Sequence, residues 1–195
     1  MKFDDLKIST KVALPAVILT VVALAIAGLL NLKQGGEPIR PPQPEGLWKK
    51  VGGQDYKYET SPGDEQYRRG LYVVLKRGSP YPSFVNFDAS ARMACVVKRS
   101  RSNTPLQALT LLNDPVYVEA TKAFAARIVK QSPGKDLHAR IELAFRMALA
   151  RTPDAHETAV LGRLWEAQFH ASKDEAAAWY AVASALLNVD ECITK

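Results

Sequence analysis

The residues of this sequence that could do chemistry are concentrated in one basic segment. Between Arg68 and Arg101 lie eight basic residues and one acid, Asp88, so the segment carries a net charge of 8 − 1 = +7. The whole chain carries +6, which leaves 6 − 7 = −1 for the remainder. Such a segment attracts anionic partners, for example an acidic or sulfated glycan, a lipid surface or another exported protein. The candidate ligand-binding residues are Arg68, Arg69, Lys76, Arg77, Arg92, Lys98, Arg99 and Arg101.

The same basic residues also have a structural interpretation, in which arginines pair with acids elsewhere in the fold. Tyrosines and phenylalanines interleave with the basic residues, a pattern that also occurs in nucleic-acid-binding proteins. The export that the N-terminal residues predict, described below, argues against a nucleic-acid partner.

Other chemistries lack their residue patterns. The three histidines fall on separate predicted helices, and His156-Glu157 begins like a zinc-protease helix but has Val160 at the place of the second histidine. There is no phosphate-binding loop, dinucleotide glycine motif or nucleophile elbow. The carboxylate pairs have capping or solvated-surface explanations. We therefore expect no catalytic residue, no metal site and no cofactor.

The two cysteines, Cys95 and Cys192, form no CxxC pair, haem motif or zinc spacing. They are either two small apolar side chains or one disulfide that closes a long loop. Export of the chain would favour the disulfide.

The first element that could position these residues is an apolar stretch at residues 12–30, which contains no charge. As a helix it spans about 28 Å at ~1.5 Å per residue, against roughly 30 Å of bilayer hydrocarbon. Three lysines precede it, which predicts a cytosolic segment at residues 1–11, a single pass of the inner membrane and an exported remainder. The stretch "LKISTKVAL" resembles the opening of bacterial chemoreceptors. The alternative is a signal peptide cleaved near Ala25-Ile26-Ala27, which would give a secreted domain.

The rest of the chain divides by composition. Residues 31–46 are rich in proline and glycine and predict an extended, semi-rigid linker. Residues 47–195 form the exported domain, in which 70–77 read as one short strand and 78–89 as an ordered loop pinned by aromatic side chains. From residue 104 the apolar spacing is helical. We expect five helices, at about 105–112, 115–131, 136–150, 153–170 and 174–189, and hence a mainly α fold behind a transmembrane helix.

Three short polar-proline units mark predicted helix starts, because a polar cap before a proline suits the first turn of a helix. The helix at 105–112 has almost only apolar residues on every side, so we expect it to be buried, with the chain turning a corner inside the core. The residues assigned to these structural caps are Thr104, Pro105, Asn113, Asp114, Pro115, Thr152 and Pro153.

Several stretches resemble a known family. "PPQPEGLW", "YRRGLYVVLKRGSPYPSFVNFDA" and "RSNTPLQALTLLNDPVYVEA" resemble the C-terminal domain of large planctomycete-type exported proteins, the domain-of-unknown-function family fifteen fifty-three. "ALARTPDAHE" and "ALLNVDECITK" resemble its later landmarks, so the resemblance runs from Gly35 to Lys195. It implies an exported location beside cytochrome-c-like or carbohydrate-binding-like modules, but no reaction. The sequence departs from the family by its apolar N-terminal stretch, where members carry further helices, and by the absence of a CxxCH haem motif.

Together these observations favour a membrane-tethered, exported binding or scaffold domain, anchored in the bilayer through residues 12–30. The alternative is the C-terminal part of an exported polysaccharide-degrading or redox system whose catalytic residues lie on another chain.

Overall fold

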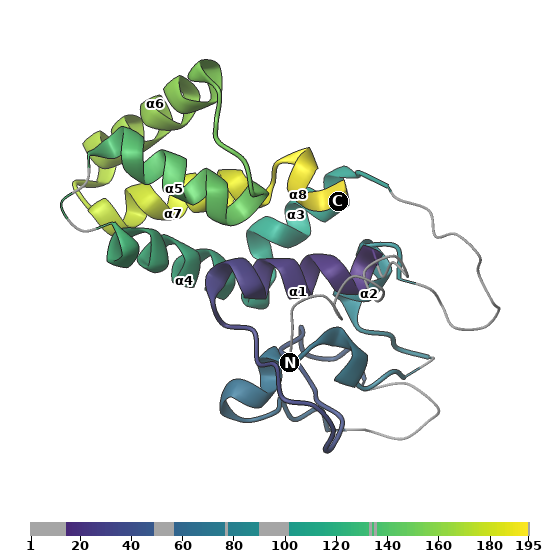
Figure 1. Ribbon diagram of the computed structural model, residues 1–195. Helices are drawn as coiled ribbons and strands as arrows, with labels where there is room; N and C mark the ends of the chain where they lie inside the picture. Colours follow the sequence, from purple (N-terminus) through teal and green to yellow (C-terminus); the bar gives the residue numbers. More distant parts are fainter. Residues whose placement is uncertain are drawn as a thin grey trace, which may run out of the picture.

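The computed structural model describes residues 15–48, 57–76, 78–89, 102–132, 134 and 136–194, and these residues fold mainly as α-helix. Figure 1 shows a helical part that contains α3 to α8, a loop-rich part below it, and α1 running between the two. The mainly α prediction is confirmed. The elements are α1 (Pro15–Ala27), the 3-10 helices η4 (Gly63–Tyr67) and η5 (Gly70–Tyr72), α2 (Pro82–Asn86), α3 (Pro105–Asn113), α4 (Pro115–Gln131), α5 (Leu137–Leu149), α6 (Ala155–Ser172), α7 (Glu175–Leu187) and α8 (Asp190–Thr194).

The centre of the core is formed by α4 and α7. α7 packs against both α4 and α6, and α4 also packs against α1. Phe124 and Ile128 on α4 and Trp179 and Leu186 on α7 are completely buried. Each such side chain contributes roughly 1.5–3 kcal/mol by leaving water. The apolar stripes that predicted these helices are therefore the surfaces along which they pack.

The structure does not support the transmembrane helix expected at residues 12–30. Within the described residues no helix is both long and apolar enough to cross a bilayer. α1 has 13 residues, and Ala23, Leu24 and Ile26 are buried in the protein core. Charge-free sequence is as typical of a buried helix as of a membrane helix, and here the apolar side chains pack against α4.

The end of α1 has a clear local cause. Gly28 adopts a φ of +78°, and the amides of Gly28 and Leu29 donate to the carbonyls of Ala25 and Leu24. This is the Schellman arrangement, which closes a helix at a glycine. The Arg127 guanidinium of α4 donates to the Ala25 and Ile26 carbonyls at 3.2 and 2.7 Å. The helix therefore stops three residues before the predicted boundary, with its last carbonyls bonded by a cation.

The prediction that the helix at 105–112 is buried is wrong for most of its leucines. Gln107 and Leu111 of α3 are 1% and 3% exposed, but Leu106 and Leu109 are each 55% exposed and Leu112 is 47% exposed. The buried face is selected by hydrogen bonding: the Gln107 side chain donates to the Asn86 carbonyl and to Ser102 Oγ at 2.9 and 3.0 Å. A fully paired amide occupies the core, and the leucine stripe points away from it.

The helix starts differ in detail from the sequence assignment. Thr104 caps α3 in a capping box with Gln107, and Pro105 is the first residue of the helix. Asp114 caps α4, and its carboxylate accepts from the Val116 amide at 3.0 Å.

Two further cap assignments change. Asn113 ends α3 and bonds the Leu109 carbonyl rather than capping α4. At α6 the cap is Asp154, not Thr152 or Pro153, because the Asp154 carboxylate and Glu157 form a reciprocal capping box.

The strand expected at 70–77 is also corrected. Residues 70–72 form the 3-10 helix η5, Val73 pairs with Ile39 only as an isolated parallel bridge, and residue 77 lies outside the described residues. The Ile39 amide donates to the Tyr72 carbonyl, and the Val74 amide donates to the Ile39 carbonyl. The next donor along the partner segment would be Pro41, which has no N–H, so the ladder cannot continue.

The proline-rich stretch at 31–46 packs along the loop-rich part as irregular chain, with bends at residues 35–37 and a turn from residue 45. Ile39 and Pro41 are buried in it, and the Tyr58 hydroxyl donates to the Pro41 carbonyl. In the segment at 78–89, Tyr81 and Phe84 pack edge to face around the short helix α2. The expected aromatic pinning of this segment is present, although its middle is a helical turn rather than a loop.

Candidate functional site

The basic segment does not form an open anion-binding surface in the described residues. Arg68 is 3% exposed, and its guanidinium donates to the carbonyls of Lys33, Gly35 and Glu37. It also lies 4.0 Å from the centre of the Tyr72 ring. Because the side chain is buried and its Nη1 and Nη2 atoms bond these carbonyls, Arg68 ties the proline-rich stretch to the domain.

Of the other described basic candidates, Arg69 lies beside the same Tyr72 ring as Arg68, whereas Lys76 lies beside another aromatic side chain. Arg69 is half-buried and lies 3.4 Å from the Tyr72 hydroxyl, and Lys76 lies 4.6 Å from the Trp48 ring centre. The pKa of Tyr72 is lowered, chiefly by the hydrogen bond from the Gly35 amide and further by Arg69. The remaining candidates lie outside the described residues, and their role stays a prediction: Arg77, Arg92, Lys98, Arg99 and Arg101.

The cysteine prediction is likewise untested. Cys192 is buried at the C-terminal end of the core, and Cys95 lies outside the described residues. No group of three or more potential metal ligands occurs in the part of the chain that the structure describes.

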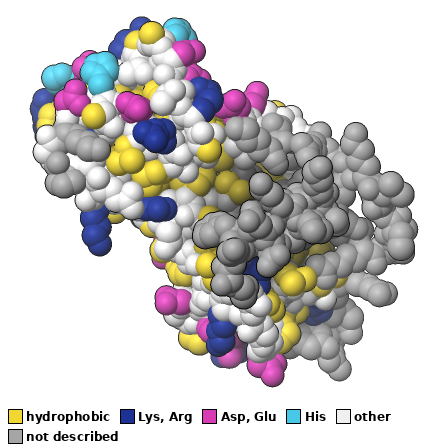
Figure 2. All heavy atoms as spheres, in the orientation of Figure 1, with side chains coloured by type: hydrophobic (Ala, Val, Ile, Leu, Met, Phe, Trp, Pro, Cys, Tyr) yellow, Lys and Arg dark blue, Asp and Glu magenta, His cyan; other side chains and the backbone are white. Residues whose placement is uncertain are grey.

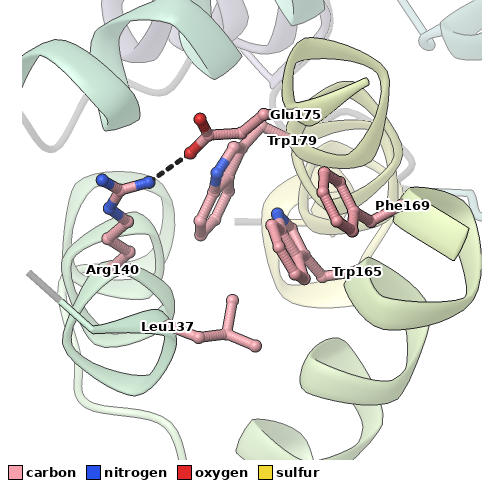
Figure 3. A pocket seen from close by; sticks show the side chains of 6 residues that line it. All are labelled: Leu137, Arg140, Trp165, Phe169, Glu175 and Trp179. Atoms are coloured by element: carbon pink, nitrogen blue, oxygen red, sulfur yellow. Dashed lines mark hydrogen bonds and ion pairs between the residues drawn. The ribbon is translucent and has the colours of Figure 1, made fainter. Parts of the chain in front are cut away.

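A pocket that the sequence analysis did not identify opens between α5, α6 and α7. It encloses about 330 Å³, and Figure 3 shows the side chains that line it. Such a volume lies at the small end of the range for ligand sites. The lining residues are Leu137 and Arg140 from α5, Trp165 and Phe169 from α6, and Glu175 and Trp179 from α7.

Local sequence positions each of these helices. Asp136 caps α5 by accepting from the Ala139 amide at 3.1 Å, which fixes the first turn that carries the α5 residues of the pocket. Between α6 and α7 the chain reverses at Lys173, whose φ of +57° is left-handed. Asp174 then caps α7 by accepting from the Ala176 amide at 2.9 Å. This tight reversal places α7 directly beside α6, so their aromatic side chains meet.

One wall of the pocket is aromatic. The Trp165 and Phe169 rings stack with centroids 4.9 Å apart and planes 10° apart, and Trp165 lies 6.2 Å from Trp179. Trp179 is completely buried, and its indole also supports the core. Flat apolar walls of this kind favour a ligand with a flat or ring-shaped body.

The opposite wall carries the charges. Arg140 donates from Nη1 to the Glu175 carboxylate, and the two side chains are 17% and 50% exposed. In Figure 3 the nitrogen and oxygen atoms gather on the side of Glu175, whereas Leu137 lies on the other side. The pocket is therefore amphipathic, with one polar and one apolar half.

Three buried donors of this pocket lack a partner among the described residues: the Nε1 atoms of Trp165 and Trp179 and the Nε atom of Arg140. Most buried polar groups in proteins are hydrogen-bonded, so three unpaired donors on one pocket call for an explanation. The only acceptor among the lining side chains is the Glu175 carboxylate, which already accepts from Arg140. The lining side chains thus offer more donors than acceptors.

Sequence reasoning missed this site because its residues obey the helical period of the core. Trp165 and Phe169 are four residues apart, as are Glu175 and Trp179, and this spacing is typical of packed helix faces. A detectable signal was the occurrence of two tryptophans and a phenylalanine on adjacent predicted helices, together with a glutamate in the first turn of one of them.

Comparison with known proteins gives a family but no function. A family model described as "Protein of unknown function (DUF1553)" matches residues 6–165, so the chain belongs to that family. The match includes the apolar N-terminal stretch, which corrects the expectation that this stretch replaces the family's own helices. It ends at Trp165, so three of the pocket residues, Phe169, Glu175 and Trp179, lie beyond it. No curated protein and no solved structure matches the chain.

Proposed function

We propose that this member of the DUF1553 family is a binding module whose pocket between α5, α6 and α7 takes the ring of an acidic sugar. The observation that carries the proposal is the combination of an aromatic wall with three unpaired buried donors. A sugar ring offers apolar C–H faces to the tryptophans and hydroxyl or carboxylate oxygens to the donors. An acidic ring supplies more acceptor capacity than a neutral one, which suits a site with surplus N–H groups.

The size of the pocket sets the expected affinity. A single sugar ring has about 12 non-hydrogen atoms, and each contributes about 0.3 kcal/mol in a ligand of ordinary efficiency. The product, about 4 kcal/mol, corresponds to a dissociation constant of about 1 mM. Tight binding of a longer glycan would then require several rings or several copies of the module.

Binding is a better match to this site than catalysis. Glycoside hydrolysis uses a pair of carboxyl groups on the two sides of the scissile bond. Among the described residues that line the pocket, Glu175 is the one carboxylate, and Arg140 holds it. The alternative function, with catalysis on another chain, remains compatible with a binding role here.

Export of the chain stays a prediction from the sequence. The membrane tether is not part of this proposal, because the side chains of α1 from Ala23 to Ala27 pack largely in the protein core.

Titration calorimetry of the full chain with D-glucuronate and D-glucose tests the proposal. We expect binding of glucuronate near 1 mM and weaker binding of glucose. Arg140→Met should abolish glucuronate binding, because it removes a charged donor. Arg146→Met is the matched control on the same helix, since Arg146 is 66% exposed and pairs only with Glu142 among the described residues.

A third variant distinguishes recognition from general folding effects. Glu175→Gln frees the Arg140 charge, and we expect it to tighten glucuronate binding while leaving glucose unchanged. Failure of both sugars to bind the wild-type chain, or equal loss in the Arg146→Met control, would contradict the proposal.

A further inference from the structure

A second hollow lies on the other side of Glu175 and Trp179, between α4 and α7. It is a groove of about 550 Å³ lined by Lys122, Ala125, Ala126, Val129 and Lys130 from α4 and by Glu175, Ala176, Trp179 and Tyr180 from α7. The α4 residues follow the i, i+3, i+4, i+7, i+8 spacing of one helix face. The hollow is therefore a groove that runs along two neighbouring helices.

Three of the residues that line the groove are alanines. Ala126 and Ala176 are exposed, and Ala125 below them is 5% exposed. A methyl group fills little of the space between two helix ridges, so a third helix can approach closely. Figure 2 shows hydrophobic side chains gathered over the helical part of this face, bordered by Lys and Arg side chains.

Two lysines mark one edge of the groove. Lys122 and Lys130 are both exposed, and neither forms an ion pair with any described residue. They lie eight residues apart on α4, which is about 12 Å along the helix axis at ~1.5 Å per residue. One small anionic group does not span that distance, whereas two acidic side chains seven or eight residues apart on a helix do.

We propose that this groove is a docking surface for an amphipathic acidic helix of a partner protein. The partner would place apolar side chains at i, i+3 and i+7 over the alanines and Trp179. Acidic side chains along the edge of that stripe would face Lys122 and Lys130. Insertion of such a helix is one of the recurring modes of peptide recognition, and the charges fix its register.

The docking surface and the sugar pocket share Glu175 and Trp179 but use different residues for recognition. The inference does not depend on the proposed sugar binding, and the two can fail separately. Ala126 and the two lysines line only the groove, so variants at these positions address the docking surface alone.

A designed peptide pair tests the proposal. The probe is a fluorescein-labelled alanine-based helical peptide with leucines at i, i+3 and i+7 and two glutamates seven residues apart beside them. The matched peptide has lysines in place of the glutamates. Fluorescence anisotropy with the full chain should show binding of the acidic peptide about tenfold tighter than the basic one, since two exposed ion pairs are replaced by like-charge contacts.

Two protein variants sharpen the result. The double variant Lys122→Glu with Lys130→Glu should reverse the preference and bind the basic peptide more tightly. Ala126→Trp should fill the groove and abolish binding of the acidic peptide, whereas Ala159→Trp, at an exposed alanine of α6, should not. Circular dichroism melting checks that each variant is folded.

Reversal by the charge swap and loss only in Ala126→Trp support the docking surface. Absence of binding by both peptides up to roughly 1 mM, or equal binding that ignores the charge swap, overturns it. Binding of dodecanoate to this groove with no peptide binding would also overturn it and would assign the groove to a small amphiphile instead.

Discussion

The helical part of the molecule (the described residues between 102 and 194) and the loop-rich part (the described residues between 31 and 89) are held together by different interactions. In the helical part, fully buried apolar side chains of α4 and α7 form one continuous core, and aspartates cap the helices α4 to α7. In the loop-rich part a small aromatic cluster is assisted by one buried arginine, which bonds backbone carbonyls of a segment that has few partners of its own. In a helix the backbone N–H and C=O groups bond one another, whereas in irregular chain these groups depend on particular side chains for their hydrogen bonds.

The two candidate binding sites lie in the same part of the molecule. Both hollows lie in the helical part, and Trp179, which lines both of them, also belongs to the core. A rigid helical frame holds the pocket side chains in fixed positions, which favours binding. In the loop-rich part, by contrast, the buried Arg68 guanidinium has a structural role, because it bonds backbone carbonyls.

The largest expected effect concerns the two aromatic cores. Phe124→Ala should destabilise the protein by about 3–5 kcal/mol, because it opens a cavity in a completely buried site. Phe84→Ala should cost at most about 3 kcal/mol, because its small cluster can collapse more readily. Urea unfolding measures both. Equal losses of stability in the two variants would contradict the difference described between the two parts.

A smaller loss is expected at Arg68. Arg68→Met keeps the apolar stem but removes the donors to the Lys33 and Glu37 carbonyls, and should cost about 2 kcal/mol. Hydrogen exchange should accelerate at residues 33–37 and stay unchanged in α4 and α7. Arg69→Met is the control. Uniform acceleration across the chain would show that the two parts unfold as one unit.

The cap of α4 should have an effect of about 1 kcal/mol. Asp114→Ala removes the acceptor of the Val116 amide, and cap losses of this kind average about that value. Burial raises the pKa of Asp114, which means that the folded protein disfavours the charged form of this carboxyl group. Asp114→Asn keeps an acceptor without the charge and should leave stability unchanged or slightly higher at neutral pH. A large loss in the asparagine variant would contradict this account.

The smallest effect is a pH dependence at the start of α6. Arg151 and the capping amide of Asp154 lower the pKa of Glu157 to about 2, from an ordinary value of 4.5. A lowered folded pKa means that the contribution is complete above about pH 4.5 and is lost as the pH falls toward 2. The melting temperature should fall over this range by more in the wild type than in Glu157→Gln. Identical dependence of the melting temperature on pH in the two proteins would show that Glu157 does not cause the loss of stability at low pH.

The same comparison explains which features could be predicted from the sequence. The helices α3 to α7 follow from apolar spacing and capping residues, and their ends lie within about two residues of the expected ones, whereas α8 was not predicted. The membrane helix expected at residues 12–30 is not supported by the described residues, because a charge-free stretch does not reveal whether lipid or protein surrounds it. The decisive contacts, between Arg127 and the α1 carbonyls, join residues about a hundred positions apart.

The burial of α3 and the pocket illustrate the same limit. Composition predicted that Leu106 and Leu109 are buried, but both are exposed. Gln107 is buried instead, because its side-chain amide donates to Asn86 and Ser102. In the pocket, Trp165 and Glu175 have the spacing of ordinary core and surface positions. Their joint role depends on the left-handed reversal at Lys173, which the sequence around it does not mark with a glycine.

The most direct test of the proposed binding site uses the indole N–H groups themselves. In a proton–nitrogen correlation spectrum, the three tryptophans give three indole signals, which Trp→Phe variants assign. On titration with D-glucuronate to several times about 1 mM, we predict that the Trp165 and Trp179 signals shift together and that the Trp48 signal stays in place. Unmoved signals of Trp165 and Trp179 at saturating sugar, or a shift confined to Trp48, would contradict the account.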